Sequence, residues 1–363
     1  MTLKAVIMAG GKGTRLRPIT YSIPKPLVPI AGKPCIGYAL DSYFRAGIKN
    51  AIITTGYKFE SLITGVLAFK NEDQNILFSV EKDPAGTAGS VKLVSKFIDE
   101  TFIVGSGDPL SDFNISEILK FHREKKAMLT IALTRIDDTS QFGIVELKDG
   151  FITKFLEKPS PEQSFSNLIN TGIYVMEPEI LEHIPCGKPY DFAKDLFPSL
   201  LKEGVRIAGY PAEGTWLDAG RPKDMIAANQ LMTEKYGTKI TGTGFKGKAI
   251  IHTPLETVEN LKLEGPIYVG ENVSIGKNTT IRRSAIYDGV TIGDDVVIED
   301  SMMMDNSRVL NGSRIEKSVI MKHTFIGENC EISESVLSPN LNLQSKSRIY
   351  NVSLSSEILD DEN

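Results

Sequence analysis

The sequence predicts an α/β protein with two parts: a Rossmann-like, mostly parallel sheet with helices on both faces, followed by a parallel β-helix of about five coils. Two observations support this prediction. Up to about residue 210, short apolar segments alternate with stretches of helical periodicity. Between residues 269 and 354, apolar side chains recur at a spacing of 17. With 363 residues, the chain is long enough to bury two hydrophobic cores.

The first part alternates expected strands with expected helices. Because strand and helix alternate, we expect a mostly parallel sheet, whose ligands bind beyond the carboxyl ends of its strands. The expected strands are 5–8, 51–55, 76–80, 101–104, 128–133, 151–156 and 173–176. Helical spacing relates Ile36, Leu40, Tyr43 and Phe44, then Ile115, Ile118, Leu119 and His122, and a closing helix is expected over 221–235.

Three ladders of apolar residues define the expected β-helix. Because successive ladders are close to six residues apart, each coil should have three short strands with inward side chains. The ladders are Ile275, Ile292, Val309, Ile326 and Leu343; Ile281, Ile298, Ile315, Ile332 and Ile349; and Val269, Ile286, Met303, Ile320, Leu337 and Leu354. This pattern resembles that of hexapeptide-repeat solenoids, which implies a left-handed β-helix.

Composition and charge argue against several classes of protein. The formal net charge is -5, which disfavours a nucleic-acid backbone as partner. The apolar run at 5–9 is too short for a signal-peptide core or a membrane span. Cys35, Cys186 and Cys330 are far apart and lack metal-ligand spacing, so we interpret them as reduced packing residues of a cytoplasmic protein.

A glycine-rich loop directly follows the first expected strand. Gly10, Gly11 and Gly13 can take positive φ and present their N–H groups to an anion. Arg15, and Lys25 between two prolines, add positive charge close by in the sequence. These features together predict a binding site for a nucleoside triphosphate.

Two other phosphate-binding motifs do not fit this loop. The dinucleotide fingerprint needs a third glycine where this chain has Leu16. The P-loop needs Gly-Lys followed by Ser or Thr, whereas Lys12 is followed by Gly13 and Lys33 by Pro34.

The segment from Gly10 to Leu16, followed by Pro24-Lys25-Pro26-Leu27, resembles the signature of sugar-1-phosphate nucleotidylyltransferases. The resemblance implies transfer of a nucleotidyl group from an NTP to a sugar-1-phosphate, with release of pyrophosphate. Gly86-Thr87-Ala88-Gly89, which opens an expected helix, resembles the variant found in mannose-1-phosphate guanylyltransferases. GTP and mannose-1-phosphate are therefore the expected substrates, with UTP or dTTP and glucose-1-phosphate as the alternative.

Two aspartates are expected to hold one Mg²⁺ ion. Asp108 ends the apolar stretch 101–108, and Asp218 lies in a second such stretch at 215–220. Mg²⁺ prefers such hard oxygen ligands, and the family pattern agrees at both positions. Asp112 is expected to cap the helix near Ser116, and the alternative is that it supports the ligands of the ion.

Three further motifs are expected on the sugar side. A glycine at 143 lets a sugar ring approach the backbone, Glu157 and Asn170 can bind hydroxyls, and Lys158 can bind the sugar phosphate. By resemblance, the residues in contact with the sugar phosphate are Gly143, Glu157, Lys158, Asn170, Thr171 and Gly172. The nucleotide is expected at Ala9, Gly10, Gly11, Gly13, Thr14, Arg15, Lys25, Gly86, Thr87, Ala88, Gly107 and Asp108, and catalysis at Arg15, Lys25, Asp108 and Asp218.

The expected domains are a catalytic domain at 1–236, a linker at 237–247 and the β-helix at 248–363. The β-helix is expected to support self-association into a homo-oligomer. Some relatives carry an acyltransferase on this part, but the candidate base, His323, is expected at a coil corner as a solvated turn residue. A non-catalytic regulatory subunit of the same architecture is a further alternative, which the retention of all four catalytic candidates disfavours.

Overall fold

The computed structural model describes residues 3–255 and 258–355. The chain divides into two compact units. The first comprises Met1–Lys12 and Cys35–Asp218, and the second comprises Gly13–Pro34 and Ala219–Asn363. The short segment with Arg15 and Lys25 is therefore grouped with the C-terminal part of the chain, while the glycines at 10 and 11 belong to the first unit.

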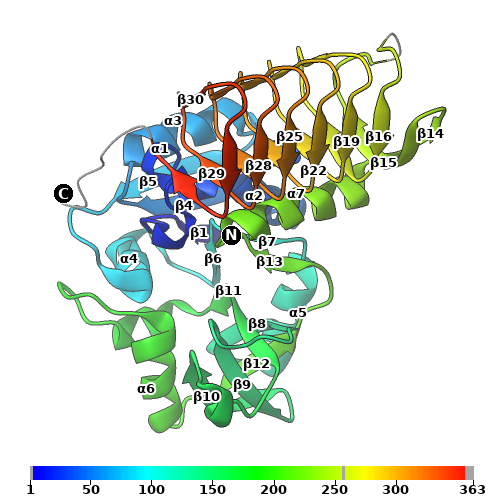
Figure 1. Cartoon of the computed structure of the whole chain (residues 1–363). Coiled ribbons are helices and arrows are strands. Elements are labelled where there is room, and N and C mark those ends of the chain that lie inside the picture. Colours follow the sequence, from blue (N-terminus) through cyan, green and yellow to red (C-terminus); the bar gives the residue numbers. More distant parts are fainter. Residues whose placement is uncertain (1–2, 256–257, 356–363) are drawn as a thin grey trace. The chain divides into compact units, whose positions relative to one another are not determined.

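A nine-stranded sheet forms the centre of the first unit, and its strand order is β5-β4-β1-β6-β11-β8-β12-β10-β9 (Figure 1). The four strands from β5 to β6 are parallel, as expected for a Rossmann-like fold. Beyond them the sheet is mixed, because β11 runs antiparallel to both neighbours and β9–β10 is a hairpin. The strands are β1 Lys4–Met8, β4 Asn50–Thr55, β5 Asn75–Val80, β6 Phe102–Ser106, β8 Leu129–Arg135, β9 Gly143–Lys148, β10 Phe151–Glu157, β11 Leu168–Met176 and β12 Ile207–Pro211.

Helices cover both faces of this sheet. Val6 and Val104 share a core with Val91 of α4, whereas the opposite face at Gly105 lies against Tyr43 of α2. Strand β1 is accordingly buried on both faces, the pattern of a sheet between two helical layers. The helices are α2 Cys35–Arg45, α3 Phe59–Phe69, α4 Gly86–Leu93, α5 Ile115–Lys125 and α6 Phe197–Lys202, with shorter turns η3 Ser95–Phe97, η4 Pro161–Gln163, η5 Pro178–His183 and η6 Phe192–Leu196.

The second unit begins with a compact segment of short elements. It ends with helix α7, which the closing-helix prediction at 221–235 anticipated, and with the β-helix. Besides the β-helix its elements are η1 Thr14–Leu16, α1 Ile19–Ser22, η2 Lys25–Leu27, β2 Pro29–Ile30, β3 Lys33–Pro34 and α7 Pro222–Tyr236.

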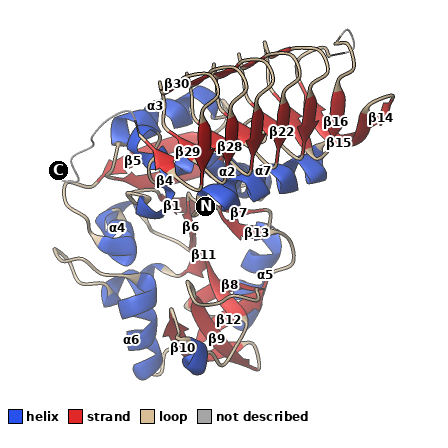
Figure 2. Cartoon of the chain, viewed as in Figure 1, coloured by secondary structure: helices blue, strands red, loops and turns tan. Residues whose placement is uncertain are grey.

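The C-terminal part is the predicted parallel β-helix, whose stacked coils run from yellow to red in Figure 1 and whose short strands are red in Figure 2. All three ladders pair in the predicted register; Ile281, Ile298 and Ile315, for example, stack on one another and are fully buried. The five strands of the first ladder form one sheet, β18-β21-β24-β27-β30. The other two ladders belong to one fourteen-stranded sheet.

The strands of the β-helix are two or three residues long. They are β16 Lys262–Glu264, β17 Ile267–Val269, β18 Ser274–Ile275, β19 Thr280–Arg282, β20 Ala285–Ile286, β21 Thr291–Ile292, β22 Val297–Glu299, β23 Met302–Met303, β24 Arg308–Val309, β25 Arg314–Glu316, β26 Val319–Ile320, β27 Phe325–Ile326, β28 Glu331–Ser333, β29 Val336–Leu337, β30 Asn342–Leu343, β31 Arg348–Tyr350 and β32 Ser353–Leu354.

The segment expected as a linker, 237–247, has regular structure instead. Strands β14 (Thr238–Gly242) and β15 (Phe245–Ile251) form an antiparallel hairpin, and β15 also pairs in parallel with β16 and β17. The glycines that suggested a linker include those of the hairpin turn, where Gly244 takes a φ of +85°. The expected domain boundaries themselves remain predictions.

Two other expectations concern cysteines and membrane segments. Cys35 and Cys330 are buried and free, as predicted, but Cys186 is exposed because it lies in the turn after η5, so its interpretation as a packing residue was wrong. Among residues 3–255 and 258–355, no helix combines the length and apolarity that crossing a bilayer would need.

Candidate active site

The glycine loop and Asp108 leave the sheet at neighbouring points. Strands β1 and β6 are paired in parallel, with Met8 beside Ser106, and the Gly107 N–H donates to the Met8 carbonyl at 2.9 Å. The order of strands reverses here, since β4 and β5 lie on one side of β1 and β6 on the other. This edge is where open α/β sheets bind ligands.

Asp108 and Asp218 are brought together by a short antiparallel pair. Strands β7 (Pro109–Ser111) and β13 (Trp216–Asp218) align Asp218 with Pro109, the residue directly after Asp108. Ser106 Oγ donates to the Asp108 carboxylate, and Cys35 Sγ donates to its carbonyl at 3.0 Å. The two acids that the sequence places 110 residues apart are therefore neighbours.

Asp112 does not cap α5, so that expectation was wrong. Its Oδ1 accepts from the Thr215 N–H at 2.7 Å, which joins the start of α5 to the approach of β13. The helix is capped by Asn114, whose side chain accepts from the N–H groups of Ser116 and Glu117. Asp112 thus stabilises the pair of strands that aligns the two acids.

The chemistry of this pair suits a magnesium ion. Mg²⁺ takes few protein ligands, commonly one or two carboxylates, and completes its shell with water and phosphate oxygens. Within the described part of the chain, no three His, Cys, Asp or Glu side chains gather into a metal site. Asp108, directly before β7, and Asp218, on the neighbouring strand β13, could supply one or two carboxylates of this kind.

The three sugar-side motifs converge on one end of the sheet. Strand β9 pairs Gly143 with Glu157 of β10, and it also pairs with Ile169 of β11, the residue before Asn170. A Cβ on Gly143 would lie 2.8 Å from Glu157 Oε2 and 2.5 Å from Phe155 Cζ, so only glycine fits there.

Asn170, Thr171 and Gly172 form an irregular stretch of β11 next to β6. Pairing with β8 is interrupted between Asn170 and Tyr174, and the Asn170 side chain accepts from the Gly172 N–H at 2.9 Å. Gly172 lies beside Ser106, and the Thr171 carbonyl accepts from Trp216 Nε1 at 3.1 Å. These contacts place the stretch beside the strands that carry Asp108 and Asp218.

Glu157 and Lys158 differ strongly in environment. Burial raises the pKa of the Glu157 carboxyl above its ordinary value, and the nearby charge of Lys158 partly offsets that rise. Lys158 is exposed, has a φ of +49° and donates its N–H to the Phe142 carbonyl at 3.0 Å. Its side chain is thus accessible to solvent, close enough to Glu157 for its charge to act on that carboxyl.

The first turn of α4 is only partly open to a nucleotide. The N–H groups of Ala88 and Gly89 both donate to the Tyr190 carbonyl, at 2.9 and 3.0 Å. Thr87 Oγ1 donates to Asp191 at 2.9 Å, so the segment before η6 closes over this turn. The N–H groups of Ala88 and Gly89 are therefore already bonded within the protein, and contact of Gly86, Thr87 and Ala88 with a nucleotide stays a prediction.

Glu81, which was not predicted as a site residue, follows β5 on the same edge. Its Oε2 accepts from the Ala85 N–H at 3.1 Å, and its Oε1 lies 3.5 Å from the place where a Cβ on Gly10 would stand. Burial raises the pKa of this carboxyl, and the bond from Ala85 opposes the rise. The position directly after a parallel strand is the signal that could have identified it.

Arg15 and Lys25 belong to the second unit. Of the three loop glycines, only Gly13 has positive φ, at +61°, and its carbonyl accepts from Thr20 Oγ1 at 2.9 Å. A Cβ on Gly13 would stand 3.3 Å from Lys25 Cβ, so the two residues pack closely. The Lys25 residue is 7% exposed, whereas Arg15 is exposed.

The histidines lie outside these clusters. His323 is an exposed corner residue with a φ of +59°, matching Gly289, Asn306 and Asn340 in the neighbouring coils, as predicted. His122 is buried between Thr130 and Glu177, and His183 pairs with Glu203 at 3.1 Å. Both side chains are engaged in contacts within the fold.

Comparison with known proteins agrees with this arrangement. The profile of the family described as "Nucleotidyl transferase" matches residues 4–235, and that of the "EIF2B subunit epsilon LbH domain" matches residues 251–349. The chain is 33% identical over 286 residues to the UTP–glucose-1-phosphate uridylyltransferase of Synechocystis, covering 74% of each chain. It is 32% identical over 277 residues to the mannose-1-phosphate guanyltransferase of Aspergillus oryzae, again covering 74% of each chain.

Among solved structures, HddC from Yersinia pseudotuberculosis, complexed with GMP-PN, matches with a TM-score of 0.55 and 27% identity. The match covers 64% of this chain and all of that one. Both the sequence profile and the arrangement of the sheet edge therefore lead to one conclusion: the chain belongs to the nucleotidyl transferase family, with a left-handed β-helix as its C-terminal part.

Proposed function

We propose that this protein transfers a guanylyl group from GTP to mannose-1-phosphate, giving GDP-mannose and pyrophosphate. The observation that supports the reaction class most strongly is the convergence on one sheet edge. The Gly10 loop, the pair Asp108 and Asp218, and the motifs at Gly143, Glu157 and Asn170 all meet there.

The chemical difficulty of this reaction is repulsion between two anions. An oxygen of the sugar phosphate attacks the α-phosphorus, a new P–O bond forms, and the bond to the β-phosphate breaks. A phosphate monoester has its second pKa at about 6, so the nucleophile is already largely dianionic near neutral pH. The reaction therefore needs positioning and neutralisation of charge rather than a general base.

The cationic residues have the roles that this chemistry requires. Arg15 and Lys25 bind the triphosphate and neutralise the charge on the departing pyrophosphate. Lys158 orients the sugar phosphate, while Glu157 and Asn170 bind sugar hydroxyls. Asp108 and Asp218 would hold Mg²⁺, which, when bound, supplies further neutralisation of phosphate charge.

Two observations support guanine as the base. The Gly86–Gly89 segment has the variant associated with guanylyltransferases, and mannose-1-phosphate guanyltransferases occur among the relatives. Glu81 adds a physical reason, because its Oε1, which Ala85 does not engage, can accept a hydrogen bond from the N1–H or N2–H donors of guanine. Uracil offers one donor between two acceptors, which suits a carboxylate less well.

UTP with glucose-1-phosphate is the alternative, since a uridylyltransferase is among the relatives at similar identity. A matrix of GTP, UTP, dTTP, ATP and CTP against several sugar-1-phosphates, assayed by pyrophosphate release with magnesium present, tests both. The proposal predicts the highest kcat/KM for GTP with mannose-1-phosphate. Highest activity with UTP or dTTP and glucose-1-phosphate would show that these are the substrates instead of GTP and mannose-1-phosphate. Absence of pyrophosphate release with every pair would refute the reaction class. Self-association through the β-helix stays a prediction.

A further inference from the structure

The segment that carries Arg15 and Lys25 ends in a tight hairpin. Strands β2 and β3 pair Pro29 with Pro34 and Ile30 with Lys33, leaving Ala31 and Gly32 as the two turn residues. Their φ angles are +46° and +80°, the geometry that matches the twist of a two-residue hairpin. An alanine with positive φ is unfavourable, so the surroundings must hold this turn in place.

Asn229 of α7 holds the tip of this hairpin. Its Oδ1 accepts from the Ala31 N–H at 2.8 Å and from the Tyr287 hydroxyl at 2.6 Å. Its Nδ2 donates to the Met225 carbonyl at 2.9 Å. The amide is 3% exposed, so a bond that it loses is not replaced by bulk water.

The β-helix contacts the same turn through two tyrosine rings. A Cβ on Gly32 would stand 2.5 Å from the Tyr268 hydroxyl, so the backbone at this position packs directly on that side chain. The Tyr268 and Tyr287 rings are 5.0 Å apart, and both residues are buried. The turn is therefore held by an amide from α7 and by side chains from the first coils of the β-helix.

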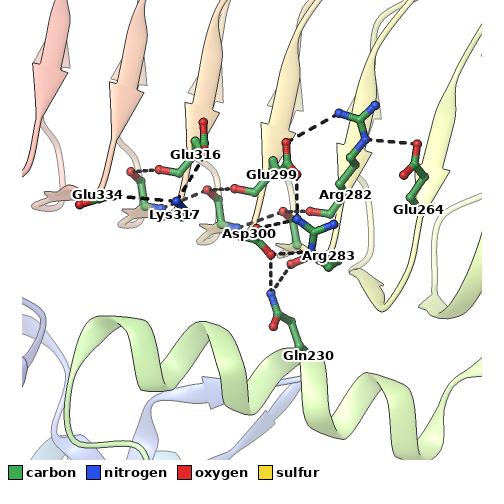
Figure 3. Close-up of polar contacts among 12 residues, drawn as sticks. Gln230, Glu264, Arg282, Arg283, Glu299, Asp300, Glu316, Lys317 and Glu334 are labelled. Atoms are coloured by element: carbon green, nitrogen blue, oxygen red, sulfur yellow. Dashed lines mark hydrogen bonds and ion pairs between the residues drawn. The ribbon is translucent and has the colours of Figure 1, made fainter.

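Helix α7 is itself fixed to the β-helix at the next residue. Gln230 Nε2 donates to the Arg283 carbonyl at 2.8 Å and to Asp300 Oδ1 at 3.1 Å (Figure 3). The Arg283 guanidinium in turn binds Asp300 and Glu299, at 2.7 Å to each carboxylate. Asn229 thus has a defined position relative to the coils.

Close packing connects the hairpin to the cationic residues. Ile30 and Val28 are buried, and the Val28 N–H donates to the Lys25 carbonyl at 3.1 Å. Lys25 packs against Gly13, two residues before Arg15. A displacement of the turn can therefore reach Lys25 through buried neighbours, and Arg15 through Gly13 and the short turn η1.

We propose that Asn229 is a positioning residue that lets the β-helix set the placement of Arg15 and Lys25 for the nucleoside triphosphate. The proposal rests on the proposed function, because it assigns these two cations to triphosphate binding. The β-helix would then control substrate affinity without contributing a residue that touches substrate.

Tyr287→Phe tests the proposal on the full-length chain, because it removes one hydroxyl and leaves the ring. We expect the Kd for GTP, measured by calorimetry, and the KM for GTP to rise about threefold to tenfold, the effect of one buried hydrogen bond. The KM for mannose-1-phosphate should stay unchanged. Hydrogen–deuterium exchange should become faster in peptides covering 24–34. In an Asn229→Ala background, which already lacks this acceptor, Tyr287→Phe should have a smaller effect than in the wild type.

Tyr350→Phe is the matched control. The Tyr350 hydroxyl also donates to a side chain, Glu331, but it lies on an exposed residue of strand β31, in a late coil. Unchanged GTP affinity or unchanged exchange in Tyr287→Phe would overturn the proposal, and so would equal effects in the control. If the wild-type protein releases no pyrophosphate, the proposed function is refuted. The positioning role of Asn229 is decided separately, by the Kd for GTP and by hydrogen–deuterium exchange in Tyr287→Phe.

Discussion

Replacing Glu81 by glutamine tests whether this carboxylate selects the base. Its Oε2 is engaged by the Ala85 N–H, which leaves Oε1, on the side of Gly10, for a ligand. In Glu81→Gln the amide oxygen can keep the bond to Ala85, and an NH₂ group then faces the donors of guanine. The variant keeps the shape of the side chain but reverses the polarity of its free end.

The expected magnitude follows from the bonds that are lost. A hydrogen bond to a charged group contributes about 1.5–3 kcal/mol. Loss of one such bond lowers kcat/KM for GTP about 10- to 150-fold, because each 1.4 kcal/mol is a factor of ten. For UTP, whose base has flanking carbonyl acceptors, kcat/KM should stay the same or rise.

The assay is pyrophosphate release with GTP or UTP at a fixed, saturating sugar-1-phosphate concentration, from which the ratio of the two kcat/KM values is taken. Glu162→Gln serves as the control, because this carboxylate is exposed on η4 and binds Ser160. A GTP-to-UTP ratio that is the same in wild type and Glu81→Gln would refute the role of Glu81 in base selection.

Three further predictions concern the cationic segment, a buried histidine and the β-helix. Lys25→Ala should lower kcat/KM by orders of magnitude with an unchanged circular dichroism spectrum, and wild-type rates would remove Lys25 from the mechanism. Burial lowers the pKa of His122 below its ordinary 6.5, against the opposing effect of Glu177. The unfolded chain therefore binds the proton more readily, so Tm should fall as pH drops through 6.5 toward the folded-state pKa; His122→Gln should flatten this dependence between pH 7 and 5. Ile298→Ala should cost about 2–5 kcal/mol in urea unfolding, and the less buried Ile349→Ala should cost less; equal costs would contradict the packing account.

Much of the fold was predictable because the relevant signals are local or strictly periodic. The 17-residue spacing identified all three ladders, since each coil repeats the same inward positions. The first coil escaped this pattern because its spacing is 18: Ile251 pairs with Val269, and Leu263 with Ile281. One added residue in this coil changes the spacing in the sequence, although the side chains still stack in the same ladder of the structure.

The site was predictable only where a residue follows a strand directly. Asp108 was found in this way, and Glu81 could have been. The hydrogen bonds from the first turn of α4 to the Tyr190 carbonyl could not be predicted. They join backbone groups about 100 positions apart, and such bonds do not depend on residue type. The bonds of Asn229 could not be predicted either, because with its partners Ala31 and Tyr287 it brings together three separate parts of the chain.

Neighbouring placement of Asp108 and Asp218 by the β7–β13 pair is the feature on which the proposed chemistry depends most. A double-mutant cycle with Asp108→Asn, Asp218→Asn and the double variant, assayed by pyrophosphate release from GTP and mannose-1-phosphate, tests it directly. If the two carboxylates hold one ion, either single change should remove most of the activity, and the double variant should be little worse than the poorer single one. Losses that simply multiply would show that the two residues act independently, and would contradict the shared site.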